Sequence, residues 1–444
     1  MACAFVASFP HRRSPDTWRG RLLVSLLAAG LGAGACTDKK GADVPGSNGA
    51  DGTGDGGSRG DAAVAGGNGA AGTPAAQQPN GPAVVYRGRF DRVTDANVAG
   101  MGWPGTEMLF GFRGTRLSVT LEAPDRGSYN GVPQALYVAY AVDGGNAQVL
   151  KLAGGKAEYV LAQGLPEGQH LVRLAKMTED QIGRILYHTV TTDGAMSYTP
   201  PASERRIEFV GDSGTAGYGA LGTYPCSFSS ATESADVAYP ALVGRLLDAE
   251  VHNCSYSGKG LIENRDYVGD AEKTLPVLWQ RTLPRDDPYV LWDANAWRPQ
   301  AVIALISGND VYHGGAGVVP SQEQFTQKVG GFIKQLRAAY PQALLMFGAS
   351  PMLRSNDPTV GQRATAIARL KATVAAANDA NVQFIDLPQD NGFNGSNCGD
   401  SNCLKDADST CLGSCTGCDS HPTPATHAIV ANSIAATLKA KLRW

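Results

Sequence analysis

From Arg206 to the C-terminus, short apolar runs alternate with stretches of helical periodicity, and this alternation constrains the fold more than any other feature. The apolar runs predict buried strands at residues 207–210, 302–306, 343–347 and 382–385. Helical periodicity occurs at residues 238–247, 322–339, 363–380 and 424–441. Strands that alternate with helices form a parallel sheet covered on both faces, and such sheets bind ligands at the carboxyl ends of their strands. We therefore expect an α/β domain over residues 205–444, with functional side chains directly after strands.

Residues 83–200 have a different pattern, in which short alternating segments are separated by Gly-rich turns. The expected strands are residues 84–86, 108–110, 116–121, 135–140 and 170–174. This spacing is typical of an all-β jelly roll or a related sandwich. A structural platform and a glycan-binding module are both open interpretations of such a domain, because sandwiches serve both purposes.

Residues 1–36 have the features of an export signal. Basic residues up to Arg21 precede an uncharged apolar run at 22–35, which is too short to span a bilayer comfortably and ends in small residues before Cys36. This stretch resembles a bacterial lipoprotein signal, which implies a lipidated Cys36 and attachment to a membrane at the cell surface or outer membrane. Ordinary secretion with an unmodified Cys36 is the alternative.

The segment from residue 37 to residue 82 contains no aromatic residue, no Leu and no Ile. It cannot bury a core, so it is predicted to be a disordered Gly/Ala-rich linker. As a random coil it would reach roughly 35–40 Å, which is enough to hold a domain clear of a surface.

The charge balance excludes some partners. With 38 basic and 41 acidic residues, the chain has no electrostatic footprint for nucleic acid, so a neutral glycan or small molecule is the more natural ligand. We expect no cofactor, and we expect a monomer.

Four short motifs occur in the α/β region. They are Gly211-Asp212-Ser213-Gly214, Ser257-Gly258-Lys259-Gly260, Ser307-Gly308-Asn309-Asp310 and Asp419-Ser420-His421-Pro422. Each has a plain explanation when taken alone, such as capping of the next helix by Asp212 or a turn at Gly258. The nucleophile and asparagine motifs follow strands predicted above, and the glycine motif follows a further apparent strand, so one shared site explains all four motifs better than four coincidences.

These residue types are the parts of a serine hydrolase site. Ser213 would be the nucleophile, His421 would take its proton, and Asp419 would orient the imidazole. The backbone N–H groups of Ser213 and Gly258 and the side-chain amide of Asn309 are suitable donors for an oxyanion hole.

The four motifs together resemble the SGNH hydrolase superfamily. The closer resemblance is to carbohydrate esterase family 2, and it rests on the further segments Tyr224-Pro225-Cys226-Ser227-Phe228-Ser229, Thr232-Glu233 and Trp292-Asp293 and on the sandwich placed before the hydrolase region. It implies an SGNH (flavodoxin-like) three-layer domain and a carboxylic ester hydrolase that removes acetyl groups from a polysaccharide, such as xylan or glucomannan, through an acyl-enzyme.

Two features depart from the pattern of the superfamily. Ser307 stands where the asparagine motif usually begins with glycine, and Asp419 precedes His421 by two residues instead of three. Family 2 is similar in the second feature, and some of its members orient the histidine with a backbone carbonyl, which leaves a triad and a dyad as alternatives. At the level of function, the alternatives are a lipid or short-chain esterase and a non-catalytic surface glycan-binding protein.

The cysteines suggest disulfides, because an exported protein meets an oxidising environment. Cys226 follows the nucleophile motif and Cys254 precedes the glycine motif, and the two are predicted to pair. Five others lie at residues 398, 403, 411, 415 and 418. Zinc at Cys415-x-x-Cys418 and calcium near residues 394–408 were considered, but no partner motif accompanies either, so no metal is expected.

Three other histidines lack a partner motif. His252 and His427 are interpreted as packed or solvated side chains, whereas His313 lies in a Gly-rich loop where a substrate contact is conceivable.

Overall fold

The computed structural model describes residues 84–124, 127–129, 131–196, 202–265, 273–286, 288–311, 319–353, 362–387 and 416–444, together with the backbone of short strands at 76–77, 389–390 and 404–405. The described residues all belong to one compact unit of the chain. The predicted export signal and linker, and with them Cys36, lie outside the described residues. So do His313 and the cysteines at 398, 403, 411 and 415.

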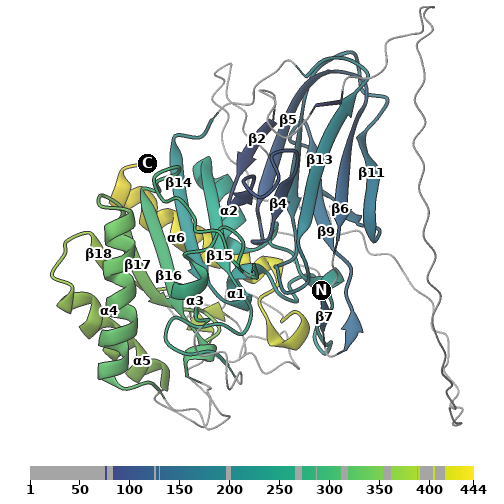
Figure 1. The fold of residues 1–444 in the computed structure, drawn as a ribbon. Coiled ribbons are helices and arrows are strands. Elements are labelled where there is room, and N and C mark those ends of the chain that lie inside the picture. Colours follow the sequence, from purple (N-terminus) through teal and green to yellow (C-terminus); the bar gives the residue numbers. More distant parts are fainter. Residues whose placement is uncertain are drawn as a thin grey trace, which may run out of the picture. The chain divides into compact units, whose positions relative to one another are not determined.

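The first part of the described chain forms two antiparallel sheets (Figure 1). One sheet has the order β11-β6-β13-β4-β3, with β1 also paired to β13, and the other has the order β10-β9-β12-β5-β2. The first contains β1 (Ala76–Gln77), β3 (Phe90–Asp91), β4 (Ala99–Met101), β6 (Leu117–Ala123), β11 (Gly155–Ala162) and β13 (Ile185–Thr192). The second contains β2 (Val84–Arg87), β5 (Glu107–Gly114), β9 (Tyr137–Val142), β10 (Gln148–Lys151) and β12 (Gly168–Lys176).

The core of this sandwich lies between its two sheets. Phe110 and Val172 from one sheet pack in the same buried cluster as Leu121 and Tyr187 from the other. The five strands expected from the alternating pattern are all present, because alternate side chains of each strand fill this core. A short hairpin, β7 (Ser128–Tyr129) and β8 (Val132–Pro133), projects from the sandwich and becomes important at the site.

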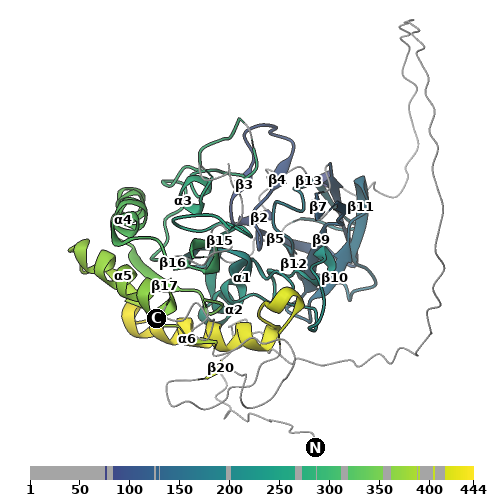
Figure 2. The same cartoon turned by 90° about the horizontal axis from the view of Figure 1, so that it is seen from below.

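The second part has a parallel sheet with the order β15-β14-β16-β17-β18 (Figures 1 and 2). Its strands are β14 (Arg205–Gly211), β15 (Ala249–Ser255), β16 (Ala301–Ile306), β17 (Leu344–Ala349) and β18 (Val382–Ile385). The helices are α1 (Ser213–Ala216), α2 (Tyr239–Leu247), α3 (Leu275–Leu278), α4 (Gln322–Ala339), α5 (Gln362–Ala376) and α6 (Pro424–Leu442). The predicted α/β architecture is confirmed.

Helices cover both faces of this sheet. Along β16, Val302, Ala304 and Ile306 join the cluster that contains α3, α4 and α5, whereas the intervening Ile303 and Leu305 join the cluster of α2 and α6. Burial on both faces explains why the strands read as continuous apolar runs. Helix α5 ends at Ala376, four residues before the predicted end, and Asn378 takes a left-handed φ of 49° soon afterwards.

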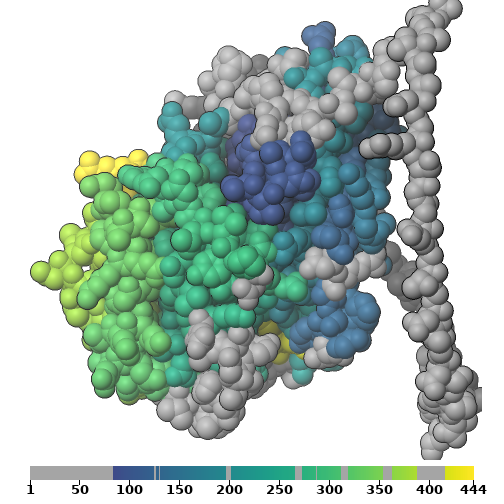
Figure 3. All heavy atoms as spheres, viewed as in Figure 1, coloured from purple at the N-terminus to yellow at the C-terminus, as the bar shows by residue number. Residues whose placement is uncertain are grey.

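A buried ion pair joins the sandwich to the α/β domain. Arg89 Nη2 lies 2.7 Å from Glu208 Oε1, and the side chains are 1% and 0% exposed. Trp279 Nε1 donates to the other carboxylate oxygen at 2.8 Å, and the Arg89 guanidinium lies 5.0 Å from the ring centroid of Trp292. On the face drawn in Figure 3, atoms of the sandwich (blue) lie against those of the α/β domain (green). The sandwich therefore packs directly against the α/β domain.

No helix in the described part of the chain is both long enough and apolar enough to cross a membrane.

Candidate active site

Ser213 is the first residue of α1 and follows β14 after a single residue, Asp212. Asp212 caps the helix by accepting a hydrogen bond from the Gly214 N–H at 3.0 Å. The turn needs glycine at 211, because a Cβ there would lie only 1.9 Å from Thr215 Oγ1. The tight turn places the serine at the carboxyl edge of the sheet, as the sequence predicts.

In the sequence, His421 lies near the end of the α/β domain, just before α6, whereas Ser213 lies near its beginning. The fold brings the two side chains together. His421 Nε2 lies 2.8 Å from Ser213 Oγ, and its Nδ1 lies 3.0 Å from the backbone carbonyl oxygen of Asp419. A carbonyl oxygen only accepts, so Nδ1 carries the hydrogen and Nε2 is the base that faces the serine hydroxyl. Burial lowers the pKa of His421 to about 4, so the imidazole is neutral at pH 7.

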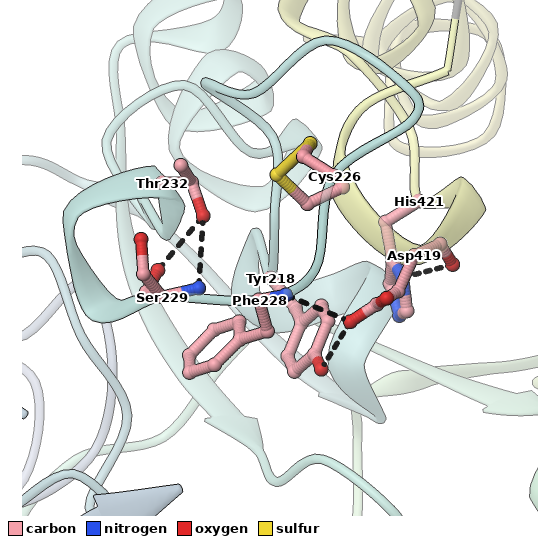
Figure 4. Close-up of a disulfide and its surroundings, with 8 residues drawn as sticks. Tyr218, Cys226, Phe228, Ser229, Thr232, Asp419 and His421 are labelled. Atoms are coloured by element: carbon pink, nitrogen blue, oxygen red, sulfur yellow. Dashed lines mark hydrogen bonds between the residues drawn. A yellow bond between two sulfur atoms is a disulfide. The ribbon is translucent and has the colours of Figure 1, made fainter. Parts of the chain in front are cut away.

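The carboxylate of Asp419 does not contact the imidazole, and the prediction that it orients His421 is wrong. Instead it accepts hydrogen bonds from the Phe228 N–H and from the Tyr218 hydroxyl, both at 2.9 Å (Figure 4). The reason is the local backbone, because Asp419 and Ser420 both have left-handed φ values, 49° and 60°. In this turn the carbonyl of Asp419 faces the imidazole while its side chain faces Tyr218 and Phe228.

Three aromatic side chains support the histidine, and two of them, Tyr129 and Tyr218, were not singled out in the sequence analysis. The Tyr218 ring lies 4.2 Å from the ring of His421 and 4.0 Å from that of Phe228. Because a carboxylate only accepts, Tyr218 donates to Asp419 and receives the hydroxyl hydrogen of Tyr129, at 2.7 Å. Tyr129 lies on the β7 hairpin, so the sandwich takes part in holding the turn. No sequence motif marks Tyr129 or Tyr218.

The glycine motif lies beside the nucleophile because β15 pairs with β14. The Tyr256 N–H donates to the Gly211 carbonyl at 3.1 Å, and Gly258 takes a left-handed φ of 77°. Within the part of the chain that the structure describes, the N–H groups of Ser213 and Gly258 have no hydrogen-bond acceptor. Two free donors next to a nucleophile are the requirement for an oxyanion hole.

Asn309 follows β16 and also reaches the nucleophile turn. Its Nδ2 donates to the Lys259 carbonyl at 2.9 Å and makes a longer contact of 3.3 Å with Asp212 Oδ2. Both amide hydrogens therefore have partners in this conformation, and only the hydrogen in the longer contact is weakly held. Asn309 thus lies at the site, as predicted. In this conformation its amide links the nucleophile turn to the glycine motif and does not present a free donor.

Asp310 joins the glycine and asparagine motifs. Its buried carboxylate accepts from the backbone N–H groups of Ile262, at 2.7 Å, and Ser307, at 2.9 Å. Burial raises the pKa of Asp310 to about 7. Ser307 also caps this turn, since its hydroxyl oxygen accepts from the Asn309 N–H at 3.2 Å, so serine in place of glycine leaves Asn309 within reach of the nucleophile turn.

The disulfide joins Cys226 to Cys418, and the predicted Cys226–Cys254 pair is wrong (Figure 4). Cys254 is a free, buried thiol on β15, and its Sγ contacts Glu208 Oε1 at 3.6 Å. Cys254 lies on a strand in the core, so its side chain faces the Arg89–Glu208 pair and not Cys226. The bridge to Cys418, which directly precedes Asp419, fastens the histidine turn to the 226–228 loop instead.

His252 and His427 have structural surroundings, as expected. The ring of His252 stacks on Trp297 at 3.4 Å, and His427 is buried on α6, where its Nδ1 accepts from the Tyr239 N–H at 3.3 Å. Among the residues of the ranges given above, no group of three or more His, Cys, Asp or Glu side chains is arranged to hold a metal ion.

Comparison with known proteins agrees with this geometry. Residues 86–201 match the family model described as carbohydrate esterase 2 N-terminal, and residues 209–429 match the GDSL-like lipase/acylhydrolase family. A crystal structure of a family 2 carbohydrate esterase with a carbohydrate-binding domain, from Corynascus thermopiles (Myceliophthora fergusii), is 30% identical, with 81% of this chain and all of that chain covered and a TM-score of 0.67. The chain belongs to carbohydrate esterase family 2.

Two further relatives are similar over most of this chain. The cellulase/esterase CelE of Acetivibrio thermocellus is 28% identical over 82% of this chain. The structure of a family 2 esterase from Clostridium thermocellum in complex with cellohexaose is 27% identical, covers 81% of this chain and 99% of that one, and has a TM-score of 0.68.

An acetylxylan esterase / glucomannan deacetylase of Cellvibrio japonicus is 32% identical over 47% of this chain. The chain spans 40% of the length of CelE and 55% of that of the Cellvibrio protein.

Proposed function

We propose that this protein is a serine esterase that removes O-acetyl groups from a polysaccharide or oligosaccharide of the xylan or glucomannan type. The observation that carries the proposal is the 2.8 Å contact between Ser213 Oγ and His421 Nε2, with a neutral imidazole whose other nitrogen is already held. The names of the family 2 relatives support acetylated carbohydrate as the substrate class.

The geometry supports a two-step reaction. Ser213 Oγ attacks the acetyl carbonyl carbon while its proton moves to His421 Nε2, and the N–H groups of Ser213 and Gly258 receive the oxyanion. The sugar hydroxyl then leaves with the proton from His421, and the acetyl group stays on Ser213. Water next attacks the acyl-enzyme and gives its proton to His421, which releases acetate and restores the serine. The carbonyl of Asp419 keeps the imidazole in place during both steps.

Asn309→Ala is expected to lower kcat by about 10²- to 10³-fold, the effect of losing one oxyanion donor. The long 3.3 Å contact with Asp212 is the one that a developing oxyanion would displace, while the 2.9 Å bond to Lys259 keeps the amide in place. Steady-state kinetics on an acetyl ester would measure this. An Asn309→Ala enzyme with normal kcat would restrict the oxyanion hole to backbone donors.

The substrate class is tested by assaying acetylated xylan and glucomannan beside short-chain and long-chain nitrophenyl esters. We expect acetate release from the polysaccharides and a strong preference for acetyl over long acyl chains. Preference for long chains would favour a lipid esterase. Binding of the polysaccharides without release of acetate would favour a non-catalytic glycan-binding protein.

We also propose that the chain is exported and attached to a membrane through a lipidated Cys36, with ordinary secretion as the alternative. The sequence of residues 1–36 supports this, and a lipoprotein-type anchor with two or three acyl chains would hold stably. Cys36→Ser should move the protein from the membrane fraction to the soluble fraction. An unchanged membrane fraction would contradict lipidation.

A further inference from the structure

Two buried carboxyl groups lie behind the glycine motif, and the mechanism above does not use them. Glu179 follows β12 in the sandwich, and Glu233 ends the short helix η1 (Ser230–Thr232) in the hydrolase domain. Both side chains are 0% exposed. Their side chains lie within hydrogen-bonding reach of each other, and the Glu179 N–H also donates to Glu233 Oε1 at 3.0 Å.

Glu179 holds the residue next to Gly258. Its Oε2 accepts from the Ser257 N–H at 2.6 Å, and its Oε1 accepts from the Ser257 hydroxyl and, at 2.7 Å, from Gln181 Nε2. Three donors thus converge on this carboxylate. The Ser257–Gly258 turn, whose Gly258 N–H has no acceptor among the described residues, is therefore fastened to a side chain of the sandwich.

Glu233, in contrast to Glu179, has few hydrogen-bond donors around its carboxyl group. Its Oε2 is buried and has no hydrogen-bond partner other than what Glu179 can offer. Its loop also contacts the nucleophile helix, because the Ser234 N–H donates to the Gly217 carbonyl at 2.9 Å. Three donors stabilise an ionised Glu179, so the proton of the pair belongs on Glu233, where it can donate to Glu179.

We propose that Glu179 and Glu233 are positioning residues for the oxyanion hole, whose carboxyl groups share one proton across the junction of sandwich and hydrolase domain and so hold the Ser257–Gly258 turn. The proposal rests on the proposed function, because it assigns Gly258 an oxyanion role. Burial raises the pKa of both groups, and the neighbouring Glu179 carboxylate raises that of Glu233 further, while the charge of Lys176 lowers both. Lys176 itself is fully buried at the end of β12 and donates to the Thr178 carbonyl.

The charges around the pair explain why a single proton remains, because among the described residues Lys176 is the one cation that acts on both Glu179 and Glu233, whereas the buried Asp180, which Lys176 also faces, has Arg285 and Arg184 beside it as well. With both carboxylates ionised, the buried cluster of Lys176, Glu179 and Glu233 would carry a net negative charge, and the carboxylates would repel each other. Loss of the shared proton at alkaline pH is therefore expected to loosen the turn and lower kcat, with little change in KM.

The test compares the wild type with Glu233→Gln, Glu233→Ala and a control, Glu122→Gln, which alters a sandwich carboxylate that pairs with His188. The glutamine amide can donate to Glu179 as the protonated acid does. We expect Glu233→Gln to keep kcat on an acetyl ester at pH 7 within about threefold and to move the alkaline fall of kcat to higher pH. Glu233→Ala should lose about 10²-fold, of the order of one oxyanion donor. The control should follow the wild-type profile.

Two measurements do not depend on activity. The raised pKa of Glu233 adds stability that is complete below the pKa of the unfolded chain and is lost as the pH rises through the folded pKa. The melting temperature should therefore fall less between neutral and alkaline pH in Glu233→Gln than in the wild type or the control. Infrared spectra of the wild type at pH 7 should contain a protonated carboxyl band that weakens in Glu233→Gln.

The outcomes separate the two proposals. If the wild type and Ser213→Ala hydrolyse acetyl esters equally, the proposed function fails, and with it the positioning role, while melting and infrared data still decide whether the proton is shared. If the wild type is active but Glu233→Gln reproduces its pH profile and melting curve, the positioning proposal is wrong. Absence of a protonated carboxyl band in the wild type at pH 7 would overturn it even if the variants failed to fold.

Discussion

Ser213→Ala is expected to abolish ester hydrolysis, with kcat reduced by about 10⁶-fold. Among the described residues, Ser213 is the hydroxyl held against the base, and without it His421 has no proton to take. The loss should appear in kcat for any acetyl ester, and mass spectrometry should detect no acylated intermediate.

The fold of this variant should persist, because the only recorded side-chain contact of Ser213 in the described residues is the one with His421. A melting temperature close to that of the wild type would confirm that the loss is chemical. Residual hydrolysis near the wild-type rate would overturn the proposed mechanism, since no other described serine has been placed against a histidine.

His421→Ala and Asp419→Asn are expected to differ by orders of magnitude, although the two residues are only two positions apart. Removing the base should cost as much as removing the nucleophile. Asp419→Asn leaves the backbone carbonyl in place, and its amide oxygen can still accept from the Phe228 N–H or the Tyr218 hydroxyl. We therefore expect kcat to fall by less than about tenfold, far from the roughly 10⁴-fold loss of a carboxylate that orients its histidine directly.

The decisive measurement is kcat for both variants on one acetyl ester, with its pH dependence. Because the pKa of His421 in the free enzyme is lowered to about 4, kcat/KM of the wild type should stay level as the pH falls from 7 and decline only near pH 4, where Nε2 becomes protonated. The pH profile of Asp419→Asn should show the same decline near pH 4. If Asp419→Asn lowered kcat several thousandfold, the carboxylate would have to orient His421 directly in solution, and the triad would be the correct interpretation.

The contacts of Asp419 with Tyr218 and Phe228 explain how its carboxylate can matter without touching the imidazole. Its carboxylate fixes a left-handed turn, which costs a non-glycine residue free energy and persists only where its surroundings hold it. Tyr218, Phe228 and the Cys226–Cys418 bridge supply that support from one side of the site, and Tyr129 extends it into the sandwich. Both domains therefore contribute to the position of one imidazole.

The strand and helix pattern determined the architecture of the chain, because burial requires an apolar run in a parallel strand and alternation in a sandwich strand. The same reasoning predicted that the motifs containing Ser213, Gly258 and Asn309 would follow β14, β15 and β16. That prediction works because neighbouring strands of a parallel sheet end at one edge, so residues far apart in the sequence must meet there.

Only the tertiary structure decided which atoms meet. The spacing of Asp419 and His421 permits a contact through either the carboxylate or the carbonyl, and two left-handed residues selected the carbonyl. Cys226 pairs with Cys418, 192 residues away, because pairing depends on spatial approach that loop spacing does not reveal. Glu179 and Tyr129 reach the site from a separate domain. Packing between domains depends on the shape of both surfaces, and no local pattern of residues encodes it.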